Sequence, residues 1–191
     1  MRWDIPLRIF PLIAVPLAIV GFSSISTEQI GLADVQDDAW WIVMVALLVP
    51  VFLVSLLFSM RYMVGYSFSK AALPLEILFY LILNPVAEEM FFRGLAQSQL
   101  AYLLGTEISI IAVAFIFGFH HWLAGFSFKF LCLATVGGFV FGVISAGSGS
   151  ILPAVLLHSA ADLGLFIIGP WYAYRINQRP SYSKSFIGRM H

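Results

Sequence analysis

Long runs of apolar residues are the feature that most constrains how this chain can fold. The clearest run covers about residues 39–59 and begins with Trp40 and Trp41. A helix needs about 20 residues to cross the hydrocarbon core of a bilayer, and tryptophan is typical of the membrane interface. Only 10% of the residues are charged and 61% are hydrophobic, whereas soluble domains carry about 25% charged residues. The sequence therefore predicts an all-α, polytopic membrane bundle that forms one domain over residues 1–191.

The apolar runs predict about six membrane-spanning segments. The third run, 71–104, is broken by Pro85 and by a charged cluster, so it is either one long bent span or two shorter ones. The other predicted spans cover about residues 9–24, 39–59, 108–123, 128–146 and 151–169. Arg2 and Arg8 would also suit a signal peptide, but no convincing small-residue cleavage site follows them.

The basic residues predict the orientation in the membrane. With six spans, nine of the ten Lys and Arg residues fall in the N-terminus, in 59–70, in the loop that holds Lys129 and in a polar tail over 170–191. The loop 22–38 carries only acidic charges, at Glu28, Asp34, Asp37 and Asp38. Loops rich in Lys and Arg stay in the cytoplasm, so both termini, including the basic tail, are predicted to be cytoplasmic. A seventh span would export that tail.

The stretch NPVAEEMFFRGLAQ, residues 84–97, places three ionisable groups inside the third apolar run. Charges at the centre of a bilayer are costly, so these side chains should face the interior of the bundle or a wet cavity. Glu89 and Arg93 are four residues apart on one helical face. Glu88 is five residues from Arg93 and is turned by about 100° from Glu89, so Arg93 is expected to neutralise Glu89 and not Glu88. This favours Glu88 as a general base, and the alternative is a purely structural ion pair.

Three histidines lie in or next to apolar spans, where an imidazole typically faces a site or a cavity. They are His120 and His121 in FIFGFHHWLAG, and His158 in ILPAVLLHSAADLGLF. Asp162 follows His158 by four residues, so both side chains should lie on one helical face. The alternative is a His–Asp pair that only joins two helices. Residue counting puts Glu88 and His158 nearer the outer side of the membrane and His121 nearer the inner side.

Taken in order, these residues resemble the CAAX-protease and bacteriocin-processing family (CPBP, also called Abi) of glutamate-type intramembrane endopeptidases. Glu88-Glu89-Met-Phe-Phe-Arg93 resembles the first family motif, Phe117-Gly-Phe-His-His121 the second, and His158-Ser-Ala-Ala-Asp162 the third. The resemblance covers about residues 75–165, the predicted catalytic core. The second motif selects His121 over His120.

The resemblance implies a role for each matched residue. Glu88 and His121 would activate water, His158 and Asp162 would stabilise the oxyanion, and Glu89 and Arg93 would support the site or orient substrate. The third motif often ends in Asn, and here it ends in Asp162. An ionised Asp accepts hydrogen bonds but donates none, so Asp162 would instead hold His158 protonated, with His158 as the donor.

The resemblance also implies chemistry without a cofactor, although zinc held by Glu88, His121, His158 and Asp162 remains an alternative. The partners expected are the lipid bilayer and a membrane-bound, lipidated or C-terminally anchored protein. A net charge of zero argues against nucleic acid. The short chain and loops suggest a prokaryotic inner-membrane protein, for which bacteriocin leader peptides, signalling-peptide precursors and sorting tails are candidate substrates. A non-catalytic immunity or partner-binding protein of the same fold is the alternative function.

Overall fold

The computed structural model describes residues 9–63 and 71–177, and this part of the chain is helical with no strand. The longer helices are α1 (Phe10–Phe22), α2 (Ala39–Tyr62), α6 (Thr106–Leu123) and α7 (Phe128–Ser148). Shorter helices are α3 (Leu73–Leu78), α4 (Asn84–Glu89), α5 (Ser98–Leu104), α8 (Leu152–Asp162) and α9 (Gly169–Asn177). A 3₁₀ turn, η2, covers Glu28–Ile30, and π-helical segments cover Phe79–Leu83 (η3), Met90–Gln97 (η4) and Leu163–Ile168 (η5). The predicted all-α membrane bundle is confirmed.

The third apolar run forms one continuous helical segment, from α3 through η3, α4 and η4 to α5. The structure thus favours one long bent span over two shorter ones. Two π-helical segments widen the helix on either side of α4. Pro85 lies just after the first of them, and proline has no N–H to give to the carbonyl four residues back. That carbonyl belongs to Leu81, and Ser159 Oγ lies 2.9 Å from it and 2.8 Å from Val155 O.

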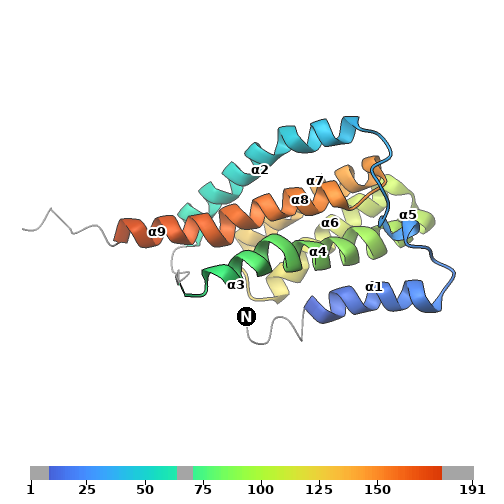
Figure 1. Ribbon diagram of the computed structural model, residues 1–191, viewed down its shortest axis with the longest axis horizontal. Helices are drawn as coiled ribbons and strands as arrows, with labels where there is room; N and C mark the ends of the chain where they lie inside the picture. The colour runs from blue at the N-terminus through green and yellow to red at the C-terminus, as the bar shows by residue number, and fades with distance from the viewer. Residues whose placement is uncertain (1–8, 64–70, 178–191) are drawn as a thin grey trace, which may run out of the picture.

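Helical segments run alternately in opposite directions through the bundle (Figure 1). Four of them, 39–62, 106–123, 128–148 and 152–176, are long and apolar enough to cross a membrane. α1 is apolar but has only 13 residues, and the helical segment 73–104 carries four charged residues, Glu76, Glu88, Glu89 and Arg93. The last helix extends to Asn177 and so ends later than the predicted span. Trp171 and Tyr172 are exposed on this extension, as is typical of residues at a membrane interface.

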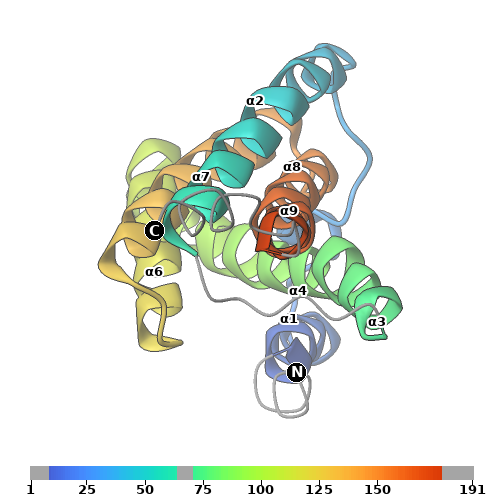
Figure 2. The ribbon, with the colours of Figure 1, turned by 90° about the vertical axis from the view of Figure 1, so that its left-hand side faces the viewer.

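The third segment, α3–α5, lies in the middle of the bundle. α1 packs on α4 and η4, whereas α2 packs on α8 and η5, and α6 and α7 form a hairpin. Seen along the bundle, α4 lies between α1 and the α8–α9 helix (Figure 2). Glu88 and Glu89 are the last residues of α4. Because α4 lies in the middle of the bundle, the charged cluster lies there too.

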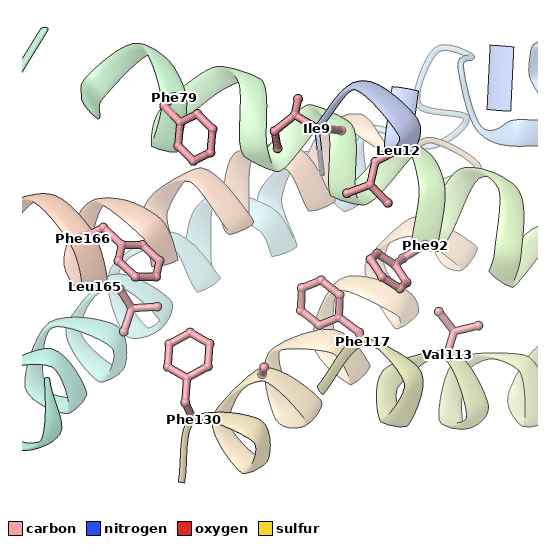
Figure 3. Close-up of a cluster of buried hydrophobic side chains, with 11 residues drawn as sticks. Ile9, Leu12, Phe79, Phe92, Val113, Phe117, Phe130, Leu165 and Phe166 are labelled. Atoms are coloured by element: carbon pink, nitrogen blue, oxygen red, sulfur yellow. The ribbon is translucent and has the colours of Figure 1, made fainter. Parts of the chain in front are cut away.

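Aromatic side chains from several segments fill the core around the third segment. Figure 3 shows this cluster, in which Phe92 of η4 lies next to Phe117 of α6. The two rings meet edge to face, with their centroids 5.1 Å apart. Ile9 and Leu12, at the start of the first apolar segment, are buried in the same cluster. The first segment is therefore part of the folded core.

The two ends of the bundle differ in charge. Arg61 and Lys129 both lie over the ring of Tyr62, at 5.3 and 4.4 Å from its centroid, so α2 ends beside the start of α7. At the other end, the acidic loop between α1 and α2 packs on the α7–α8 turn through Ile151 N–Gly31 O and Gln36 N–Ser148 O bonds, both 3.0 Å. Basic residues at one end and an acidic loop at the other agree with the predicted orientation. Other basic residues of the predicted cytoplasmic side lie outside the described residues, namely Arg2, Arg8, Lys70, Arg179, Lys184 and Arg189.

The orientation can be tested by labelling single cysteines with a membrane-impermeant maleimide in intact cells. Cys132 is exposed, so the background is Cys132→Ala. We expect Asp34→Cys in the acidic loop to be labelled from outside and Ala124→Cys in the α6–α7 turn to be labelled only after lysis, since both positions are exposed at opposite ends. The reverse pattern would overturn the predicted orientation.

Candidate functional site

A buried polar cluster lies within the otherwise apolar bundle. It gathers side chains from α4, η4, α6 and α8, namely Glu88, Glu89, Arg93, His121, His158 and Asp162. Their exposed fractions lie between 0% and 7%. The structure therefore brings together all six residues that the sequence singled out, including those that residue counting had placed at different depths. The bends of the third segment allow this, because each π-helical turn changes which residues face the centre.

Glu88 lies between the two imidazoles. Its Oε2 atom is 3.7 Å from His121 Nε2 and 3.8 Å from His158 Nε2. Both separations are longer than a direct hydrogen bond. His121 Nδ1 lies 2.8 Å from the carbonyl oxygen of Phe117, and because a carbonyl can only accept, Nδ1 carries the proton. In the neutral ring, Nε2 of His121 is then an acceptor that faces Glu88.

His158 is held most closely by Glu89, a contact between helices that the sequence did not predict. Nδ1 of His158 lies 2.8 Å from Glu89 Oε1, and its Nε2 lies 3.7 Å from Asp162 Oδ1. The predicted common face of His158 and Asp162 on α8 is present. The ring of His158 stacks on Phe141, with centroids 5.2 Å apart, so the imidazole is fixed by a carboxylate on one edge and an aromatic face beside it.

Arg93 forms the predicted ion pair with Glu89, with Nε 3.1 Å from Oε2. Its Nη2 also donates to the carbonyl oxygen of Gly138 on α7, at 3.1 Å. The guanidinium lies over the ring of Phe117, 4.3 Å from the centroid, a favourable position for a cation on an aromatic face. Arg93 thus connects η4 to α6 and α7 while it neutralises Glu89.

Two buried amides near the cluster were not predicted. Asn84 Nδ2 donates to Asp162 Oδ2 at 3.0 Å, and Gln97 Nε2 donates to Gly142 O at 3.0 Å. A signal for both exists in the sequence, because Asn84 precedes Glu88 by four residues and Gln97 follows Arg93 by four. Residues four apart share a helical face. His120 packs on the ring of Phe92, with centroids 5.4 Å apart.

A cavity of about 220 Å³ lies beside the cluster. His121, His158 and Asp162 form its polar wall, and most of the other lining residues are apolar. Val54 of α2 and Val136 of α7 line the cavity and are themselves exposed on the outer face of the bundle. The cavity therefore extends from the imidazoles toward the surface between α2 and α7. That surface would face lipid in a membrane.

The sequence left zinc, held by Glu88, His121, His158 and Asp162, as an alternative. Within 9–63 and 71–177, no group of three or more His, Cys, Asp or Glu side chains could hold a metal ion.

One family model matches the chain, over residues 70–164, and it is described as type II CAAX prenyl endopeptidase Rce1-like. The match includes all three motifs and the whole polar cluster. No curated protein and no solved structure matches the chain.

The Arg93–Glu89 pair should be required for stability. We expect Arg93→Met to lower the free energy of unfolding by about 3–5 kcal/mol, because it removes the guanidinium from the buried Glu89 carboxylate and leaves it only the contact with His158. Arg61→Met, at the exposed end of α2, should change it by only about 0.5 kcal/mol. Unfolding in mixed detergent micelles, followed by circular dichroism, measures both. Equal losses in the two variants would contradict this role for the pair.

Proposed function

Since the chain belongs to the CAAX protease family, whose name describes endopeptidases, we propose that it cleaves a peptide bond within the membrane by means of water activated between Glu88 and His121. The observation that carries this proposal is the meeting of Glu88, His121 and His158 beside an apolar cavity. Neither a serine nor a cysteine nucleophile is needed for such a reaction.

Water is activated by two acceptors. With Glu88 Oε2 and His121 Nε2 3.7 Å apart, one water molecule can donate one hydrogen to each at ordinary hydrogen-bond lengths. Its lone pair then points away from both acceptors, toward a substrate carbonyl carbon. As the oxygen attacks that carbon, the water proton passes to Glu88, which acts as the general base.

His158 stabilises the oxyanion in this mechanism. Its Nδ1 is held by Glu89, and in the doubly protonated ring Nε2–H is the donor for the negative oxygen. A donor that is already in position where charge develops is a large contribution to catalysis. Asp162 and Glu89 keep this ring oriented, and Arg93 in turn holds Glu89.

The reaction is completed when the C–N bond of the tetrahedral intermediate breaks. Glu88 returns the proton taken from water to the leaving amine nitrogen, and the carbonyl re-forms as a carboxylic acid. One water molecule is consumed, and the products are a new C-terminus and a new N-terminus.

The substrate proposed is a membrane-bound or membrane-anchored protein or peptide of a prokaryotic inner membrane. Support comes from the cavity, whose apolar walls suit an apolar chain segment and which opens toward lipid between α2 and α7. Bacteriocin leader peptides, signalling-peptide precursors and C-terminal sorting tails all contain such segments, and lipidated proteins present an apolar chain as well.

A non-catalytic immunity or partner-binding protein is the second candidate. One observation favours it, since Glu88 is fully buried and a substrate in the cavity meets the imidazoles first. Loss of the Glu88 carboxylate should then leave function intact, whereas proteolysis requires it.

Replacement of Glu88 by Gln separates these two functions. We expect Glu88→Gln to lower the amount of cleaved membrane peptides at least about 100-fold, because a general base contributes about 10²–10⁴ in rate. Comparative mass spectrometry of membrane peptides from cells that carry each variant measures this. Glu107→Gln, at an exposed position in the first turn of α6, is the matched control and should resemble the wild type. Unchanged peptides in Glu88→Gln would support the non-catalytic function.

Chelation separates the water mechanism from zinc. A peptide identified by that comparison is incubated with purified protein after exhaustive dialysis against a chelator. We expect full cleavage, because the proposed activation of water depends on two protein acceptors. Loss of cleavage that added Zn²⁺ restores would instead assign Glu88, His121, His158 and Asp162 as metal ligands.

A further inference from the structure

Asn84 is a buried amide that neither the motifs nor the proposed mechanism uses. It begins α4, four residues before Glu88, and only 4% of it is exposed. Its Nδ2 donates to Asp162 Oδ2 at 3.0 Å. The orientation of this amide is determined by its partner, since an ionised carboxylate can only accept and must therefore face the NH₂ group.

The local backbone explains how Asn84 reaches α8. It follows the π-helical segment η3 and precedes Pro85, at the bend of the third segment. Ser159 of α8 contacts the Leu81 carbonyl at the same bend. Two polar contacts from one face of α8, at Ser159 and Asp162, thus meet the bend between Leu81 and Asn84. α4 and α8 are held in a fixed relation next to the site.

The bond from Asn84 determines how the Asp162 carboxylate is turned. Oδ2 is taken by the amide, and the other oxygen, Oδ1, then lies 3.7 Å from His158 Nε2. This is the ring nitrogen that also faces Glu88. A freely rotating carboxylate would present either oxygen, or neither, to the imidazole. With the amide in place, one oxygen faces it.

The contact with Asp162 uses only the NH₂ group of the Asn84 amide. Asn84 Oδ1 is buried too, and within the described residues it has no hydrogen-bond partner. The orientation of the Asn84 amide is therefore set by its hydrogen bond to Asp162.

We propose that Asn84 is a positioning residue, which orients Asp162 through its amide and thereby sets the environment of His158 Nε2 at the edge of the cavity. The inference rests on the proposed proteolytic function, to which it adds a residue outside the family motifs. Asn84 touches neither the water nor the substrate carbonyl and acts through Asp162 alone.

A double-mutant exchange tests the bond itself. Asn84→Asp sets two carboxylates against each other at a 3.0 Å contact and should lower the thermal midpoint in detergent. Asp162→Asn in the same chain restores one donor and one acceptor and should recover most of that loss. Contacting residues show such non-additivity, whereas independent ones do not. Additive effects of the two substitutions would overturn the proposal.

The positioning role is tested by the nitrogen-15 signals of histidine in labelled protein. The chain has four histidines, and His158 is assigned from the spectra of His120→Gln, His121→Gln and His191→Gln. We expect Asn84→Leu to move the His158 Nε2 signal and to leave Nδ1, held by Glu89, in place. Gln97→Met is the matched control, since it removes an equally buried amide bond to Gly142 O away from Asp162, and should move neither signal.

The spectra do not depend on catalysis, so the two proposals can fail separately. An unmoved Nε2 signal in Asn84→Leu, or the same movement in Gln97→Met, overturns the role of Asn84 whatever the peptide comparison shows. If cleavage is established, Asn84→Leu should also reduce it about tenfold, the effect expected from the loss of one hydrogen bond to a charged group. Cleavage equal to that of Gln97→Met would likewise contradict the proposal.

Discussion

The burial of charge inside an apolar bundle is the constraint on which the rest of this structure depends. An ion in a low-dielectric interior costs several kcal/mol unless it is paired and hydrogen-bonded. Glu89 meets that requirement twice, with Arg93 at 3.1 Å and His158 at 2.8 Å. Arg93 continues to the Gly138 carbonyl on α7. One carboxylate therefore links η4, α8 and, through Arg93, α7, and it leaves the imidazole of His158 little freedom.

The shape of the third segment follows from its sequence as well as from this pairing. Pro85 removes a backbone donor, and π-helical segments lie on both sides of α4. π-helical turns are frequent at functional sites because the added residue re-aims side chains. Here they allow Asn84, Glu88 and Glu89 to face α8, and Arg93 to reach α7. A straight α-helix would keep a fixed angle between these faces along its whole length.

Contacts within one helix were accessible from spacing. The Glu89–Arg93 pair and the common face of His158 and Asp162 both follow from residues four apart. Contacts between helices could not be inferred from spacing. The nearest partner of His158 is Glu89, 69 positions earlier in the chain, and the partner of Asn84 is Asp162, 78 positions later. Spacing carries no information about which faces of distant helices meet, so the residue count had put His121 and His158 at different depths.

The sequence by itself determined the class of fold, the approximate spans and the residues of the charged cluster, because the apolar runs and the cost of charge within them are properties of the chain. It also indicated the family through three ordered motifs. Only the tertiary structure decided that the third run is one bent segment, that Glu89 joins Arg93 to His158, and that an apolar cavity lies between α2 and α7 beside the imidazoles. These depend on how helices pack, and the bends, crossing and depth of each helix are set by side chains of its neighbours.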